Sequence, residues 1–161
     1  MFTLSDICNI AIQIERNGEA VYRRACEETN NQDHARVLGI MADDEKKHAQ
    51  WFSHLCADDK PVEKDAQIAQ MGRELLQNMM AQQTFSLSSD RLAGADDAVD
   101  LFSQSIEFEN DTILFYEMLQ SFLEDELAIE RLEQIIGEER DHIDKLKQML
   151  DRHNTEKQPA T

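Results

Sequence analysis

Apolar residues recur every three or four positions along most of the chain, a spacing that places them on one face of an α-helix. The chain has only five glycines and two prolines in 161 residues. The alternating apolar and polar runs typical of strands are scarce. The pattern therefore predicts an all-α protein. Capping and turn-prone residues divide it into long helices expected at about 3–30, 33–57, 96–123 and 126–153, and a shorter helix at about 63–83.

An acidic residue, Glu15, stands within the apolar stripe of the first predicted helix. A carboxylate on a core-facing stripe is costly to bury without a partner, so it needs an explanation. A Glu recurs 94 residues later, and other polar residues share this offset. The repeated pairs are Glu15 with Glu109, Glu45 with Glu139, His48 with His142, and Tyr22 with Tyr116. This shared register indicates a duplicated helical hairpin.

The turns agree with this duplication. Glu15 and Glu45 have their midpoint at Asn30, a turn-prone residue, and Glu109 and Glu139 have theirs at Glu124. Each Glu then lies roughly 22 Å from its turn at the rise of an α-helix, so all four meet halfway along the bundle. The predicted helix at 63–83 spans roughly 30 Å and can return the chain between the hairpins. The prediction is a ferritin-like four-helix bundle with a long helical crossover between two antiparallel hairpins.

These residues match the ligands of a carboxylate-bridged site for two metal ions. In each Glu-x-x-His motif the two side chains share one helix face. Carboxylate and imidazole ligands without thiolates suit iron, manganese or zinc. A single such motif is more often a surface pair, but two in one register favour a metal site. The predicted metal ligands are Glu15, Glu45, His48, Glu109, Glu139 and His142. We expect Glu15 and Glu109 to bridge the two ions.

Residues beside the ligands suggest supporting roles. Metal-bound histidines usually donate their second N–H to a carboxylate or carbonyl. We expect Asp44 to support His142 and Glu138 to support His48, although both acids also fit a solvated helix surface. Tyr22 and Tyr116, the candidate catalytic residues, are expected to donate hydrogen bonds to ligand carboxylates rather than only to pack in the core. Glu19, one turn beyond Glu15, fits a charge at the rim better than an additional metal ligand.

The net charge of -17 comes from 33 acidic and 16 basic residues. Such a surface repels nucleic acid and anionic lipid and attracts cations. Cys8, Cys26 and Cys56 form no C-x-x-C pair, which favours free thiols in a reducing compartment. No signal peptide or membrane-spanning stretch is evident. We therefore expect a cytoplasmic protein without nucleic-acid or membrane partners. One domain is expected over residues 1–153, followed by a disordered tail at 154–161.

The motifs resemble the ferritin-like domain of the rubrerythrin family. The resemblance rests on Ile12–Tyr22 and Asp43–His48 in the first half and on Ile106–Tyr116 and Glu138–His142 in the second. It covers almost the whole chain except the tail. It implies a non-haem site with two iron ions that reacts with hydrogen peroxide or oxygen. Manganese or another divalent metal fits the same ligands.

Two departures from the family pattern bear on function. The chain lacks the two C-x-x-C pairs of a rubredoxin module, so the resemblance implies an external electron donor such as a separate rubredoxin. Thr112 stands where rubrerythrins place an additional Glu, and the remaining ligands resemble the ferroxidase site of bacterioferritins. Lys46 replaces the haem-binding Met of those proteins, so haem is not expected.

Three functions remain open at this stage. The first is a di-iron oxidoreductase, acting as a peroxide reductase or a ferroxidase. The alternative is iron handling, in which Fe(II) is oxidised, transferred or stored. The third is a metal-bound structural or regulatory module. We rank redox chemistry first. A homodimer is expected by analogy with bundles of this kind.

Overall fold

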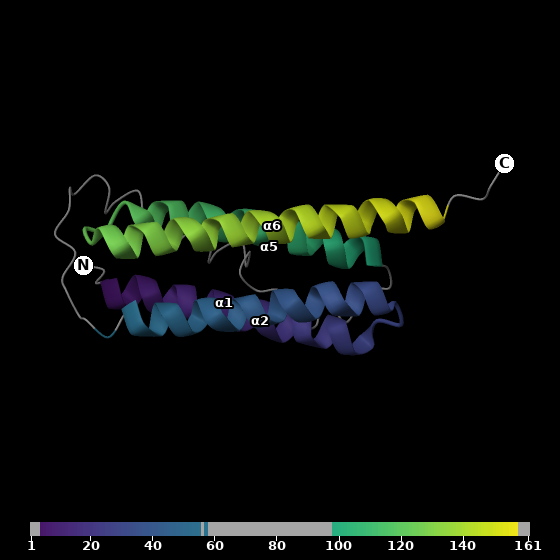
Figure 1. Ribbon diagram of the computed structural model, residues 1–161, viewed down its shortest axis with the longest axis horizontal. Helices are drawn as coiled ribbons and strands as arrows, with labels where there is room; N and C mark the ends of the chain where they lie inside the picture. Colours follow the sequence, from purple (N-terminus) through teal and green to yellow (C-terminus); the bar gives the residue numbers. More distant parts are fainter. Residues whose placement is uncertain (1–3, 56, 58–97, 158–161) are drawn as a thin grey trace.

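The computed structural model describes residues 4–55, 57 and 98–157, which form four helices in two layers (Figure 1). One layer contains α1 and α2, and the other contains α5 and α6. The described residues contain no strand. The predicted all-α four-helix class is confirmed. The helices are α1 (Leu4–Glu28), α2 (Gln32–Leu55), α5 (Ala98–Gln120) and α6 (Glu126–Glu156).

Each layer is an antiparallel hairpin, as expected. The α2 helix ends at one end of the bundle, whereas α5 begins at the opposite end (Figure 1). The α2 and α5 helices are consequently parallel. This is the arrangement that the predicted crossover requires. The predicted crossover helix at 63–83 lies outside the described residues, as do residues 3 and 96, where the first and third long helices are predicted to begin.

Both hairpin turns lie where the register placed them. The α1–α2 turn occupies residues 29–31, and the Asn31 Oδ1 atom accepts hydrogen bonds from the backbone N–H groups of Asp33 and His34 at 3.0 and 3.1 Å. An Asn side chain in this role is a favourable N-cap. In the second turn, Asp125 caps α6 by accepting from Leu127 N at 3.3 Å. The capped turns fix where both hairpins begin their return.

The last helix is longer than expected. It ends at Glu156 rather than near His153, so the first residues of the expected tail are helical. The Thr155 hydroxyl donates to the Asp151 carbonyl at 2.8 Å, and Lys157 N donates to the His153 carbonyl at 3.3 Å. These bonds satisfy carbonyls of the last turn and extend the helix. Residues 158–161 lie outside the described part of the chain.

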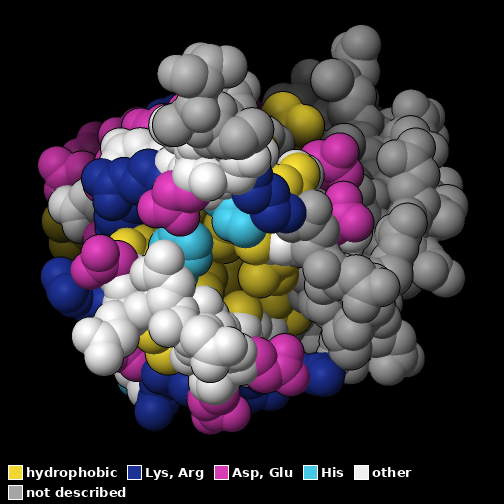
Figure 2. Space-filling model, turned by 90° about the vertical axis from the view of Figure 1, so that its right-hand side faces the viewer, with side chains coloured by type: hydrophobic (Ala, Val, Ile, Leu, Met, Phe, Trp, Pro, Cys, Tyr) yellow, Lys and Arg dark blue, Asp and Glu magenta, His cyan; other side chains and the backbone are white. Residues whose placement is uncertain are grey.

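Two apolar clusters fill the bundle on either side of its middle. One contains Ile7 and Ile14 of α1 together with Phe52, Phe115 and Leu132. The other is built from the opposite halves of the same helices and fills the end where α6 finishes. Figure 2 shows apolar side chains at the centre of that end, with charged side chains around them. No helix in the described ranges is long and apolar enough to cross a membrane.

Candidate metal centre

The six predicted ligands come together in the middle of the bundle. Each has a relative exposure of 0%, and together with Ser105 and Thr112 they are the buried polar residues of the described chain. Their ligand atoms form two overlapping groups, within each of which the atoms lie no more than 4.8 Å apart. The groups are Glu15, Glu45, His48 and Glu139, and Glu45, Glu109, Glu139 and His142. The duplication therefore produces one shared cluster rather than two separate ones.

The grouping of the ligand atoms differs from the bridging roles expected from the sequence. Glu45 and Glu139 belong to both groups, whereas Glu15 and Glu109 belong to one group each. The reason lies in the packing, because α2 and α6 contact each other across the two layers and bring their Glu side chains to the centre. This grouping favours Glu45 and Glu139 over Glu15 and Glu109 as the shared ligands. Glu15 and Glu109 occupy the outer positions.

Each histidine presents Nδ1 to the cluster and Nε2 to an acid from the other hairpin. The His48 Nε2 atom lies 2.5 Å from Glu138 Oε2, and the His142 Nε2 atom lies 3.4 Å from Asp44 Oδ2. The predicted pairing of the two acids with the two histidines is confirmed. With a metal bound, a proton on Nε2 would leave the Nδ1 lone pair free for the ion, which is the tautomer a metal ligand requires.

Two tyrosines hold the outer glutamates. The Tyr116 hydroxyl donates to Glu15 Oε1, and the Tyr22 hydroxyl donates to Glu109 Oε1. Each tyrosine thus supports the Glu of the other hairpin, and the predicted hydrogen bonds are confirmed. Burial, followed by the negative charge of the bonded Glu, raises the pKa of both phenols well above their ordinary value. Both tyrosines therefore stay protonated and remain donors.

The remaining polar atoms of the cluster point inward without aligned hydrogen bonds. The Nδ1 atom of His48 lies 2.8 Å from Glu139 Oε1, and that of His142 lies 3.0 Å from Glu139 Oε2. These are ion-pair distances, but the atoms lack hydrogen-bond geometry within the described structure. Buried polar atoms in native proteins are nearly always satisfied. Eight are left for a cation: Glu15 Oε2, both carboxylate oxygens of Glu45 and Glu139, Glu109 Oε2, and Nδ1 of His48 and His142.

The pKa values of the carboxyl groups in the cluster also favour binding of cations. Burial, followed by the charge of Glu139, raises the pKa of Glu45 well above its ordinary value and that of Glu109 to about 7. Burial acts similarly on Glu139, but its close contacts with the imidazoles of His142 and His48 outweigh it and lower its pKa to about 2. Without a metal the cluster therefore keeps protons on some carboxylates. Two divalent cations would replace them and balance four carboxylate charges.

The raised pKa of Glu109 predicts how the metal-free protein responds to pH. Its folded value of about 7 exceeds the ordinary 4.5, so the folded state holds a proton that the unfolded state releases in this window. Stability should therefore fall as pH rises from about 4.5 to about 7. Chelator-treated protein should unfold at a higher urea concentration at about pH 5 than at about pH 7. A stability that rises over this range in the chelator-treated protein would contradict the assigned protonation.

One close approach in the site was not predicted from the sequence. A Cβ atom at Gly18 would lie 2.7 Å from Glu45 Oε2 and 3.1 Å from Glu45 Cδ, closer than packing allows. Gly18 therefore gives the Glu45 carboxylate its space against α1. Its counterpart in the register is Thr112, which is also buried and donates from Oγ1 to the Phe108 carbonyl at 2.9 Å. The sequence signal for this close approach is a glycine inside a predicted helix, one turn after the ligand Glu15.

Replacing Gly18 by alanine should displace the Glu45 carboxylate and weaken metal binding by about tenfold, equivalent to roughly 1.4 kcal/mol. The matched control is Gly137→Ala in α6, where a Cβ would meet nothing within 4 Å. Alanine there should keep metal affinity and stabilise the helix by up to about 1 kcal/mol. Metal titrations and urea unfolding of both variants test this. Equal metal affinity in the two variants would show that Gly18 does not position Glu45.

The two supporting acids should differ in their effect on metal binding. Glu138 lies nearer its histidine than Asp44 does, at 2.5 against 3.4 Å. Hydrogen bonding to His48 lowers the pKa of Glu138, and hydrogen bonding to His142 lowers that of Asp44. Glu138→Gln should therefore weaken metal binding by about 10–100-fold, and Asp44→Asn should weaken it less. Competition with a coloured chelator measures both, and the reverse order would contradict this geometry.

The other acidic, histidine and cysteine side chains singled out in the sequence do not belong to the two ligand groups of the metal centre. Glu19 is partly exposed and pairs with Arg23 at 3.2 Å, consistent with the rim position expected for it. His34 lies edge-on to Phe102 and His54 is exposed, and neither belongs to a ligand group. Cys8 is buried and Cys26 is partly buried. Cys56 lies outside the described residues.

Comparison with known proteins agrees with this geometry. A family model described as Rubrerythrin matches residues 6–86. The fold is similar to that of a Thermotoga maritima protein, provisionally described as a ferritin-like diiron-carboxylate protein, whose crystal structure was determined at 2.30 Å resolution. The two share 24% sequence identity with a TM-score of 0.72, over 93% of this chain and 95% of that one. At this identity the likeness shows the fold alone, and it confirms the ferritin-like class. No curated protein sequence gives a significant match.

Proposed function

Because the chain belongs to the rubrerythrin family, we propose that it is a di-iron oxidoreductase that reduces hydrogen peroxide or oxygen with electrons from a separate donor. The observation that carries this proposal is the pair of overlapping ligand groups, which share Glu45 and Glu139 and are fully buried. Carboxylates shared in this way would hold two ions close enough to act on one small molecule.

The roles of the residues follow from their contacts. His48 with Glu15 and His142 with Glu109 would each complete one ion position, and Glu45 with Glu139 would bridge the two. Bound iron supplies the one-electron ferrous–ferric chemistry. Glu138 and Asp44 keep the histidines in the binding tautomer. The apolar clusters on both sides keep bulk water from the centre, which strengthens every electrostatic interaction inside it.

The tyrosines fit a part in proton handling. Their hydroxyl protons already lie on hydrogen bonds to Glu15 and Glu109. Reduction of peroxide to water consumes two protons, and these phenols are donors at the outer carboxylates. Tyr22 and Tyr116 are therefore the proposed catalytic residues. The additional Glu of rubrerythrins is not available at Thr112, whose hydroxyl is bonded to its own helix.

Iron handling is the second candidate. The strongly acidic surface favours it, because a net charge of -17 concentrates cations near the protein. In that role Fe(II) would enter the same cluster, be oxidised there and leave as product. The buried ligand set can also serve this role. The difference between them lies in how much iron the protein takes up.

Anaerobic titration with Fe(II), followed by mixing with peroxide or oxygen, separates these functions. The oxidoreductase should saturate near two irons per chain and react rapidly with peroxide, and added donor should return it to the ferrous state. Continued uptake far beyond two irons after oxidation would favour iron handling. If stopped-flow absorbance shows no reaction with peroxide or with oxygen, the redox proposal is wrong.

A further inference from the structure

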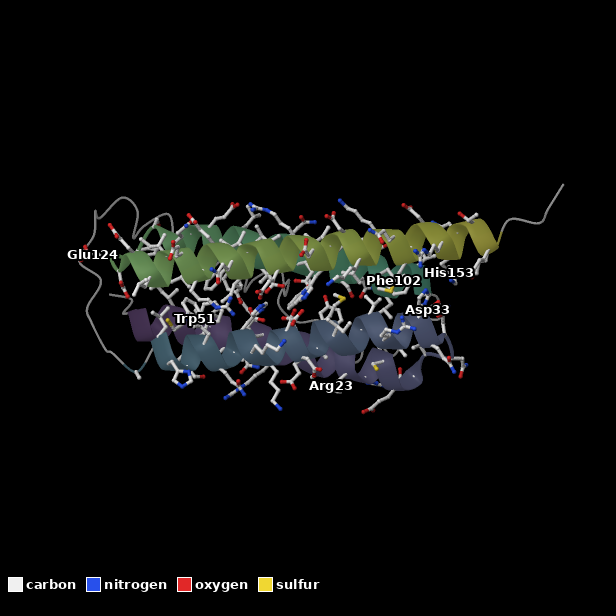
Figure 3. All side chains as sticks on the ribbon, in the orientation of Figure 1. Arg23, Asp33, Trp51, Phe102, Glu124 and His153 are labelled. Carbon is white, nitrogen blue, oxygen red and sulfur yellow. The ribbon has the colours of Figure 1, made fainter. Side chains whose placement is uncertain are left out.

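A continuous series of aromatic rings leads from the metal centre toward the surface of α2. The Tyr116 hydroxyl is bonded to Glu15, one of the outer ligands. Its ring lies 5.0 Å from the ring of Phe52, measured between centroids, and Phe52 lies 4.9 Å from the ring of Trp51. Phe52 is fully buried, whereas Trp51 is partly exposed. Figure 3 shows Trp51 toward the end of the bundle that holds Glu124.

This series breaks the duplication of the two hairpins. The register pairs Tyr116 with Tyr22, and both tyrosines hold an outer glutamate. It pairs Phe52 with Leu146 and Trp51 with Lys145, neither of which is aromatic. On that side, Tyr22 lies edge-on to the ring of His142, a predicted ligand, 6.5 Å away. Only the Tyr116 side, within the described chain, therefore has rings leading outward.

We propose that Trp51, Phe52 and Tyr116 form a route for single electrons between the surface of α2 and the metal centre. Tryptophan and tyrosine are the most easily oxidised aromatic side chains. Phenylalanine is not oxidised by oxidants that convert tryptophan or tyrosine to a radical. Phe52 therefore serves as a bridge whose π-system couples its two neighbours. Saturated side chains couple redox partners much less well over the same distance. The proposal rests on the oxidoreductase function proposed above, but its test does not require turnover.

The route transfers one electron without net transfer of a proton. Once hydrogen peroxide has oxidised the iron-loaded centre, Tyr116 would release one electron toward it and its phenolic proton to Glu15 Oε1, along the hydrogen bond already present. Trp51 then returns an electron to Tyr116 through Phe52, and the proton moves back from Glu15. A one-electron carrier of rubredoxin type reduces Trp51 at the surface. The result is one electron passed from the carrier to the centre.

The test oxidises Trp51 directly and follows the electron vacancy inward. The full chain is supplied with zinc, which has no redox chemistry of its own, and the experiment is repeated without metal. The oxidant is flash-generated ruthenium(III) tris(bipyridine), a cation that the acidic protein attracts. Trp51 is the single tryptophan of the chain, so the first radical has one source. Transient absorption should show this radical decaying as a tyrosyl radical forms.

Single-residue variants show which side chains carry the electron. Tyr116→Phe should abolish the tyrosyl signal, whereas the matched Tyr22→Phe should leave it unchanged. Phe52→Leu introduces the residue that the other hairpin carries at this position and should slow the transfer severalfold. Circular dichroism checks that each variant is folded. The phenylalanine variants keep their rings, so the comparison between the two tyrosines remains decisive if Phe52→Leu does not fold.

Two results would overturn the proposal. One is a tyrosyl radical that survives in Tyr116→Phe or disappears in Tyr22→Phe. The other is an unchanged transfer rate in folded Phe52→Leu. These outcomes are independent of the proposed function. A chain that binds no iron but transfers the vacancy to Tyr116 would keep the route and lose the function. Rapid peroxide chemistry without the tyrosyl radical would do the reverse.

Discussion

Glu139→Gln should abolish occupancy of both metal positions, because Glu139 belongs to both ligand groups and contacts Nδ1 of both histidines. Glutamine keeps the size of the side chain but removes a negative charge and half of its ligand oxygens. Metal affinity should fall by more than about 100-fold, the upper range for residues that only support a ligand. Metal analysis of the purified variant should find less than one ion per chain.

The matched control is Glu130→Gln, the same chemical change at an exposed position on the same helix. It should bind metal as the unmodified chain does. Glu15→Gln belongs between these two, because Glu15 is part of one group only. It should weaken one ion position more than the other. Equal losses in Glu15→Gln and Glu139→Gln would contradict the bridging assignment.

Removing the metal should destabilise the protein strongly. Metal at about 1,000 times its dissociation constant stabilises the folded state by about 4 kcal/mol per site. A domain of this size shifts its Tm by about 2–4 °C per kcal/mol, so chelation at one site alone should lower the Tm by about 8–16 °C. Four buried carboxylates repel one another in the metal-free state, as the raised pKa of Glu45 reflects.

Differential scanning calorimetry with and without chelator measures this change. Glu139→Gln provides the control, since a chain that binds no metal should have the same Tm in both conditions. The amount of metal bound before chelation has to be measured on the same sample. An unchanged Tm in a chain shown to lose its metal would mean that the cluster is satisfied without cations.

The fold was predictable because the same constraint applies in both hairpins: the two ligand Glu residues of a hairpin must lie at equal distances from its turn. The positions of Glu15 and Glu45 fixed the first turn, and Asn31 then caps α2 within that turn. Glu109 and Glu139 locate the second turn near Glu124 in the same way. Supporting contacts followed as well, since an acid directly before a ligand Glu projects toward a histidine of the opposite helix. Glu138 is an example, and the contact of Tyr116 follows from its shared register with Tyr22.

The details that could not be predicted depend on how the two hairpins approach each other. Sequence register gives the height of each side chain along the bundle but not the distance between helices. The membership of Glu45 in both ligand groups follows from the contact between α2 and α6, which the register does not contain. The space left by Gly18 has the same origin. The ring series ending at Trp51 also depends on rotation of α2 against α5.

The central claim is that one two-ion centre is assembled between the duplicated hairpins. Anomalous diffraction at the iron edge, from crystals grown anaerobically with Fe(II), tests it most directly. We predict two peaks in the middle of the bundle, both in contact with Glu45 and Glu139. His48 and Glu15 should contact one peak, and His142 and Glu109 the other. A single peak, or peaks away from these six side chains, would contradict the account.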